Sequence, residues 1–111
     1  MINLQHKELA TGRWNQLPFV EQMANIGSEV ERALNWKAKN NPDYCQKAFE
    51  RALELIDLSL EGSKGYPRFK ELTRLREALV DYFFGENQFM SSGPLWRKYF
   101  LSFTYAARKN Y

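Results

Sequence analysis

The sequence predicts an all-α protein, an up-down-up-down antiparallel four-helix bundle with an N-terminal arm or short extra helix. Two patterns favour this fold. Each of the four prolines opens a segment whose apolar residues recur at helical spacing, and proline suits the start of a helix because its missing N–H would have no partner there. The connections between the segments are short, which places consecutive helices antiparallel to one another. A chain of 111 residues is enough for one domain.

The first helix is expected at Pro18–Lys39 and the second at Pro42–Glu61. Gly27 lies at the edge of the first helix's apolar stripe, where the lack of a side chain allows a neighbouring helix to approach closely. Asn41 is the expected N-cap of the second helix, because its side-chain oxygen can accept a hydrogen bond from an otherwise free backbone N–H. The two inward stripes comprise Phe19, Met23, Ile26, Val30, Ala33 and Leu34, and then Cys45, Phe49, Ala52, Leu53, Ile56 and Leu60.

The third helix is expected at Pro67–Phe84, with Gly85 as the residue that follows its C-terminus. The fourth is expected at Pro94–Lys109, capped by Ser92 or Gly93. Residues 18–111 would then form the single bundle domain, and the connection 85–93 is its only long loop. Residues 1–17 form the predicted arm, which holds either a short helix near Leu4–Ala10 or an extended segment packed by Leu4, Leu9 and Trp14.

The overall composition favours a folded domain and leaves the partner open. Hydrophobic residues make up 44% of the chain and aromatic residues 15%, unlike disordered chains. The net charge of +3 is mild for a dedicated nucleic-acid binder. There is no apolar run long enough to span a membrane and no signal-peptide pattern, so we expect a cytoplasmic protein.

The sequence excludes several catalytic and metal-binding chemistries, and we expect no cofactor, no metal and no catalytic residue. His6 is the only histidine, so Glu-x-x-His di-iron pairs and Ser–His or Cys–His nucleophiles are missing. Neither Arg74 nor Arg76 is followed by the histidine that pairs with arginine in small helical nucleases of the HEPN class. Cys45, the only cysteine, is interpreted as a small buried hydrophobe; the alternative is a reactive thiol near a helix start.

Acidic residues recur along one flank of the second helix. A metal-binding ridge and a solvated helix face are both possible interpretations, and the solvated face is favoured because a hard-metal site needs ligands from several elements. The acids concerned are Glu50, Glu54, Asp57 and Glu61.

Arg76 occupies an unusual position for a charged residue. On a helical wheel it lies between Phe69 and Phe83, near the middle of the third helix's apolar stripe. Because a desolvated guanidinium is costly without a partner, we expect a structural clamp with a carboxylate, or a side chain whose head reaches solvent. Glu29 is the first candidate partner, and an anion or RNA contact is the alternative.

Two helices carry apolar residues outside their inward stripes. A second apolar face on one helix indicates contact between subunits, contact with another protein, or burial by the N-terminal arm. Self-association as a dimer or higher oligomer is therefore expected. The predicted interaction faces comprise Tyr44, Arg51, Leu55 and Leu58 on the second helix, and Leu101 and Tyr105 on the fourth.

Charge is distributed unevenly along the chain. Residues 42–61 contain five acids and two bases, a net charge of −3, whereas residues 94–111 contain four bases and no acid, a net charge of +4. Opposite faces of this kind can support head-to-tail assembly or direct the fourth helix toward a polyanion. The alternative is a basic last helix suited to its own dipole. The candidate nucleic-acid contacts are Arg97, Lys98, Tyr105, Arg108 and Lys109, with Tyr111.

Three stretches, EQMANIGSEVERA, FERALELIDL and LREALVDYFFG, carry a resemblance. Over residues 12–108 the chain resembles a group of small uncharacterised bacterial and archaeal proteins, which implies a stand-alone helical domain with no transferable catalytic residue. Its size and helix plan are more loosely similar to the four-helix family of the 23S rRNA intervening-sequence proteins and the accessory proteins of diversity-generating retroelements. That likeness implies oligomers, some of which bind nucleic acid.

The expected function is therefore a non-enzymatic interaction module without a membrane segment. It would self-associate or bind a protein partner through the outer faces of the second and fourth helices. The alternative is an RNA- or DNA-binding accessory protein that uses the basic fourth helix.

Overall fold

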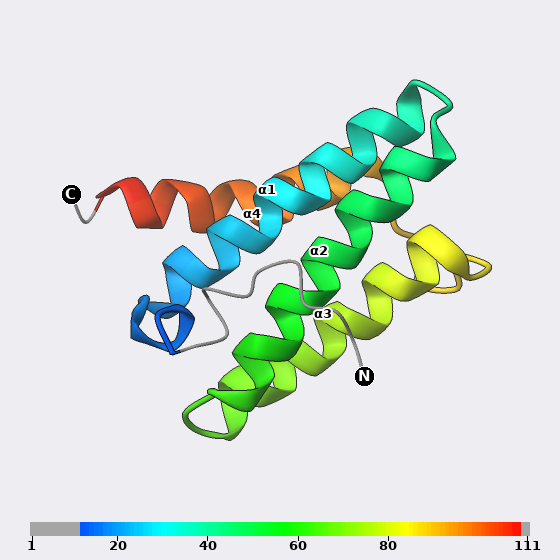
Figure 1. Cartoon of the computed structure of the whole chain (residues 1–111). Coiled ribbons are helices and arrows are strands. Elements are labelled where there is room, and N and C mark those ends of the chain that lie inside the picture. The colour runs from blue at the N-terminus through cyan, green and yellow to red at the C-terminus, as the bar shows by residue number, and fades with distance from the viewer. Residues whose placement is uncertain (1–11, 110–111) are drawn as a thin grey trace.

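Four long helices make up almost all of the structure, a computed structural model that describes residues 12–109. They are α1 (Phe19–Ala38), α2 (Pro42–Glu61), α3 (Tyr66–Phe84) and α4 (Gly93–Lys109), preceded by a short 3₁₀ helix η2 (Trp14–Gln16). No strand occurs within the described range, so the all-α class is confirmed (Figure 1).

The helix starts lie within one residue of their predicted positions, and the local chemistry accounts for each shift. Pro18 is the N-cap of α1 rather than its first helical residue, whereas Pro42 opens α2 directly. Asn41 is confirmed as the N-cap of α2, because its Oδ1 accepts a hydrogen bond from the Tyr44 N–H at 3.1 Å. Ser92 caps α4 by accepting from the Leu95 N–H at 3.3 Å.

Helix α3 ends at Phe84 and is followed by Gly85, as predicted. A glycine that follows a helix commonly adopts a left-handed conformation, but Gly85 is extended, with φ −98° and ψ −159°. Its N–H instead donates to the carbonyl oxygens of Val80 and Asp81 at 3.1 and 3.0 Å. The chain therefore leaves α3 in an extended direction and continues into the loop 85–92.

The first three helices run back and forth beside one another. In Figure 1, α2 returns along α1, and α3 returns along α2. Their facing stripes form a core of fully buried residues that includes Met23, Ile26, Phe49, Ile56 and Leu79. Because α2 contacts α1, α3 and η2, it is the central element of the domain.

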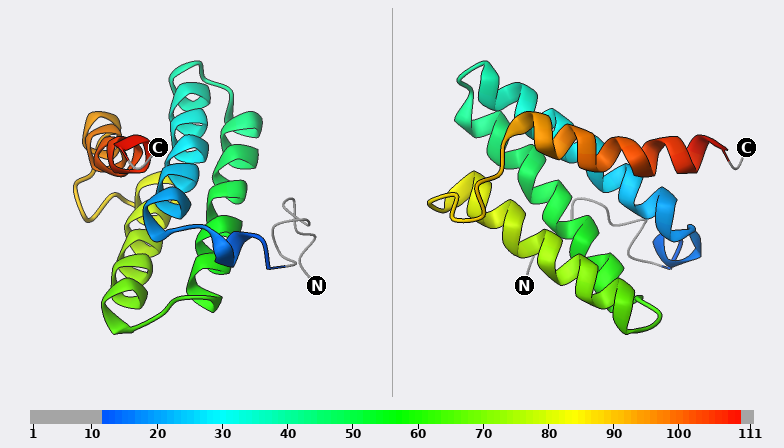
Figure 2. Two further views of the ribbon diagram at one scale, coloured as in Figure 1. Left: turned by 90° about the vertical axis from the view of Figure 1, so that its left-hand side faces the viewer. Right: turned by 180° about the vertical axis from the view of Figure 1, so that it is seen from behind.

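Helix α4 packs mainly on α1 and crosses it obliquely, on the side opposite α2 (Figure 2). Gly27 is the point of close approach: a Cβ atom placed there would lie 2.8 Å from Cβ, Cγ and Cδ1 of Phe100. The predicted role of this glycine is confirmed. Only a bare backbone at this position allows the Phe100 ring to lie against α1.

The turn η2 closes the end of the α1–α2 pair. The Trp14 indole is fully buried, and its Nε1–H donates to Ser59 Oγ on α2 at 2.9 Å. Gln22 of α1 donates in turn to the Trp14 carbonyl oxygen at 2.9 Å. The predicted packing of Trp14 is confirmed, whereas the expectations for Leu4–Ala10 lie outside the described residues.

None of the helices within residues 12–109 has both the length and the apolar character needed to cross a bilayer.

Candidate interaction surfaces

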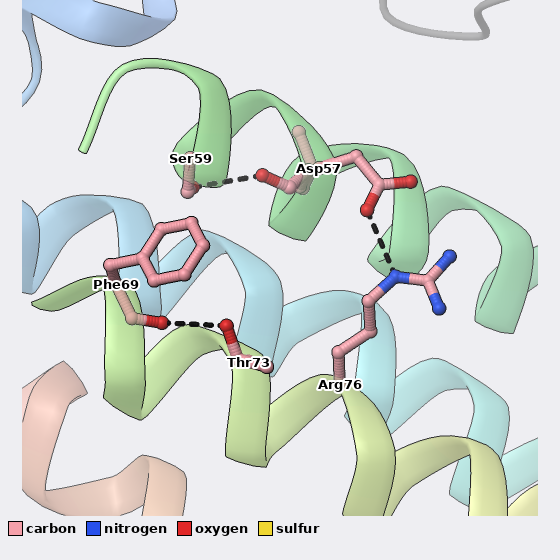
Figure 3. Close-up of polar contacts among 6 residues, drawn as sticks. Asp57, Ser59, Phe69, Thr73 and Arg76 are labelled. Atoms are coloured by element: carbon pink, nitrogen blue, oxygen red, sulfur yellow. Dashed lines mark hydrogen bonds and ion pairs between the residues drawn. The ribbon is translucent and has the colours of Figure 1, made fainter.

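Arg76 meets a carboxylate of the neighbouring helix, and the partner differs from the predicted one. Its Nε donates to Asp57 Oδ1 of α2 at 2.9 Å, as Figure 3 shows. The two side chains are 41% and 47% exposed. The guanidinium therefore spans the α2–α3 seam and ends in solvent, so this is a surface clamp rather than a buried ion pair.

Glu29 was the predicted partner of Arg76, and this prediction is wrong. Its Oε1 instead accepts from Arg32 Nη1 at 3.3 Å, one turn along the same helix. Glu29 is buried, and its Oε2 has no hydrogen-bond partner within residues 12–109. The physical reason for the difference is position: Asp57 lies on the α2 face beside α3, whereas Glu29 is on α1, which shares no extensive contact with α3.

The four acids of α2 do not share one environment. Glu61 and Glu50 are exposed, and Glu50 accepts from Gln46 Nε2 at 3.1 Å. Glu54 is buried and Asp57 is paired with Arg76. Only Glu50 and Glu61 therefore fit the interpretation as a solvated helix face. Within residues 12–109, no group of three or more Asp, Glu, His or Cys residues is arranged to hold a metal ion.

The predicted second face of α2 is largely covered, which corrects the sequence-based prediction of a free interaction surface. Leu55 is only 2% exposed and belongs to the same core cluster as Trp14, and Leu58 is partly buried against that cluster. Arg51 is half-buried. Tyr44 alone is exposed, and its ring packs edge-on against Trp36 of α1 with centroids 4.8 Å apart. The helix is central in the domain, so it has little free surface.

The outer face of α4, by contrast, is open. Leu101 and Tyr105 lie one turn apart and are 65% and 67% exposed. Beside them a hollow of about 570 Å³ lies along the α1–α4 seam, and Leu101 forms part of its wall. Gly27 and Ser28 line its α1 side. The structure thus leaves Leu101 and Tyr105 uncovered beside a hollow whose lining also includes the charged residues Glu31 and Arg32. Lys98, Arg108 and Lys109 add exposed positive charge to α4.

One of the predicted basic contacts of α4 is already occupied. Arg97 Nε donates to both carboxylate oxygens of Glu31, at 3.1 and 2.9 Å, and its Nη2 donates to Asn35 Oδ1 at 3.3 Å. Both partners are on α1, so Arg97 joins α4 to α1. Of the other candidates, Lys109 holds its ammonium 6.0 Å from the Tyr105 ring centroid.

A second groove lies between α3 and α4, and no sequence pattern predicted it. Its volume is about 530 Å³, and Trp96 and Tyr99 of α4 face Leu75 and Ala78 of α3 across it. Burial, and then the charge of Glu71, raises the pKa of the Tyr99 hydroxyl. The Trp96 indole N–H is buried without an acceptor within residues 12–109. The rim carries Lys70 and Arg74.

The loop 85–92 presents large apolar side chains to solvent. Phe89 is 61% exposed and Met90 is 81% exposed, and the loop lies at one extremity of the molecule (Figure 1, yellow). Sequence reasoning treated this segment only as a long connection. The available signal was two consecutive large apolar residues inside an otherwise polar loop.

Cys45 lies in a shallow pocket of about 400 Å³ at the end of the α1–α2 pair, together with Lys37, Phe49, Phe83 and Phe84. Burial raises the pKa of its thiol, and the Lys37 charge lowers it by less. The thiolate is thus disfavoured, which supports the interpretation of Cys45 as a small packing residue rather than a nucleophile.

No protein-family model, curated protein or solved structure matches this chain. The resemblances drawn from the sequence therefore stay predictions, and the function is argued from the surfaces themselves.

Proposed function

We propose that this protein is a cytoplasmic, non-enzymatic interaction module that binds a protein partner, a second copy of the chain included, through the outer face of α4 and the adjacent hollow on α1. The observation that carries the proposal is the pair Leu101 and Tyr105, one turn apart on α4 and both about two-thirds exposed, with Leu101 in the wall of the α1–α4 hollow. Tyrosine is enriched among the residues that dominate binding energy. Apolar side chains at the rim of a hollow favour a protein partner.

The sequence predicted interaction faces on two helices, and only the face on α4 is used in this proposal. Leu55 and Leu58 of α2 already pack in the core cluster, so they are not available to a partner. The α4 face lies on the opposite side of α1 from α2 (Figure 2), and a partner bound there leaves the α2–α3 half of the domain uncovered.

The test compares two variants of α4 that differ in the face they change. Leu101→Ser with Tyr105→Ser removes the apolar pair, and Leu95→Ser changes another exposed apolar residue of the same helix. Partners are identified by crosslinking and mass spectrometry and then purified, and their dissociation constants are measured by calorimetry. We expect the double variant to weaken binding about tenfold or more, equivalent to about 1.4 kcal/mol, and Leu95→Ser to bind like the wild type. Equal binding by all three proteins would contradict the proposal.

Nucleic-acid binding through α4 is the second candidate, favoured by the exposed Lys98, Arg108 and Lys109 around Tyr105. This second candidate has less support because Arg97 already forms an ion pair with Glu31. Salt separates the two functions. Binding of a single-stranded RNA should fall steeply between low and physiological salt because phosphate contacts release counterions, whereas an apolar protein contact should change little.

A further inference from the structure

The loop 85–92 is held in one conformation by hydrogen bonds from its own flanks. Asp81, in the last turn of α3, accepts from the Gln88 N–H with Oδ1 at 2.8 Å and from the Phe89 N–H with Oδ2 at 3.0 Å. Asn87 exchanges two hydrogen bonds with the Ser91 backbone, at 2.8 and 2.9 Å. Hydrogen bonds to an ionised carboxylate are stronger than neutral ones, so the loop is fixed.

This fixed conformation includes backbone strain at the loop tip. Asn87 and Met90 both have φ of 56°, in the left-handed region. Asparagine tolerates that region, but a long side chain such as methionine rarely occupies it. Strain of this kind persists where the surroundings enforce it, and it is concentrated at functional sites. Here the strained segment holds the apolar side chains of Phe89 and Met90 out into solvent.

The groove between α3 and α4 has the chemistry to receive such a tip. Trp96 and Tyr99 provide an aromatic wall, and Leu75 and Ala78 provide an aliphatic one. A methionine sulfur and a phenylalanine ring both contact aromatic rings favourably. The Trp96 indole N–H lacks an acceptor within the described chain, and buried donors of this kind normally have one.

The charges of the loop and the groove are complementary. The only charged residue of the segment 85–92 is Glu86, and the carboxylate of Asp81 lies directly beneath the loop. The groove rim carries Lys70 and Arg74, both exposed, against one acid, Glu71. An anionic membrane surface attracts basic segments, so it is a poor match for this acidic tip.

We propose that the loop 85–92 is a preformed docking element whose Phe89 and Met90 insert into the α3–α4 groove of a second copy of the chain. Within one molecule the two sites do not meet, because both side chains remain mostly exposed. Trp96 lines both this groove and the α1–α4 hollow, but the contact uses neither Leu101 nor Tyr105, so either proposal can fail while the other stands.

A mixing experiment tests this contact. The double variant Phe89→Ser with Met90→Ser loses the apolar loop tip and keeps an intact groove. The double variant Lys70→Glu with Arg74→Glu loses the basic groove rim and keeps an intact tip. Masses are measured by light scattering over a concentration series, after circular dichroism and urea unfolding have shown both variants to be folded. We expect the wild type to assemble with rising concentration, each variant alone to lose the higher-mass species, and their equimolar mixture to give a one-to-one dimer. One intact tip and one intact groove remain in that mixture.

Two controls sharpen the result. Lys47→Glu with Lys64→Glu makes the same charge change at two exposed lysines that do not line the groove and should assemble like the wild type. Asp81→Ala keeps Phe89 and Met90 but removes the carboxylate that fixes the loop, and it should weaken assembly through the lost preorganisation. A wild type that stays monomeric, a variant that retains its higher mass, or a mixture that stays monomeric would overturn the proposal.

Discussion

Arg76 can occupy a position within the apolar stripe of α3 because its side chain is long enough to reach solvent. The stem of Arg76 crosses the seam between α2 and α3, and its guanidinium reaches Asp57 at the surface. The sequence identified Arg76 as a structural contact but not its partner, because a helical wheel gives the direction of a side chain within one helix and not the rotation of the neighbouring helix. The sequence predicted Glu29, whereas Asp57 is the partner because α2 and α3 lie side by side.

Replacing Arg76 should therefore have a small effect on stability. Both partners are more than a third exposed, and ion pairs in solvent contribute about 0–1 kcal/mol. We expect Arg76→Met to change the free energy of unfolding by less than about 1 kcal/mol, because the methionine keeps the apolar stem contacts. Leu79→Ala, one turn further along the same stripe and fully buried, should cost about 2–5 kcal/mol. Urea unfolding of both variants measures the contrast, and similar losses would contradict it.

Tyr99 should make the stability depend on alkaline pH. Its pKa in the folded protein is raised by burial and by Glu71 above the unfolded value of about 10. Between these values the unfolded chain loses the proton and the folded one keeps it, so stability is full below pH ~10 and falls as the pH rises further. We expect the urea midpoint of the wild type to decrease between pH 8 and 10.5 by more than that of Tyr99→Phe. Tyr105→Phe, on the exposed face of α4, is the control and should follow the wild type.

At the scale of the helices, local signals in the sequence were enough to predict where most of the helices begin. Proline, Asn41 and Ser92 act within one turn of the helix start, so the beginnings of α2, α3 and α4 could be predicted closely. The end of α3 before Gly85 was also predicted, but the extended conformation of this glycine depends on Asp81 and on the folded loop beyond it. Leu55 was placed on a free face because the covering of α2 by its neighbours is a property of the assembled helices.

The close crossing of α1 and α4 depends on Gly27, so a larger residue at this position should destabilise the protein. Gly27→Ala should gain about 1 kcal/mol in helix propensity but places a methyl group 2.8 Å from Phe100 Cβ. That atom is held close to the α4 backbone and cannot rotate away. Overpacking costs about 1–3 kcal/mol, so we expect a net loss in the free energy of unfolding.

A double-mutant cycle with Phe100→Ala checks the cause of that loss. The cost of Gly27→Ala should be smaller in this background, because alanine removes Cγ and Cδ1, two of the three Phe100 atoms that lie 2.8 Å from the added methyl group. Ser28→Ala, at the next and exposed position, should stay within about 0.5 kcal/mol. An unchanged cost in the Phe100→Ala background would show that the Phe100 side chain beyond Cβ is not responsible.

Across the whole molecule the helices differ in how many neighbouring elements they pack against. Helix α2 packs against α1, α3 and η2, whereas α4 packs mainly on α1. Segments with fewer packed neighbours open at lower free energy. In native-state hydrogen exchange we therefore expect the amides of α2 to exchange more slowly than those of α4. Equal protection of both helices, or a more protected α4, would contradict this order.

The hydrogen bond between Trp14 and Ser59 joins residues 45 positions apart, and this has a consequence for the growing polypeptide. On the ribosome the indole of Trp14 emerges early and stays without its acceptor until the end of α2 has also left the exit tunnel. The α1–α2 pair closed by this turn is then the earliest unit that can fold during synthesis. Helix α4 is made after the other three helices and docks onto a surface of α1 that is already in place.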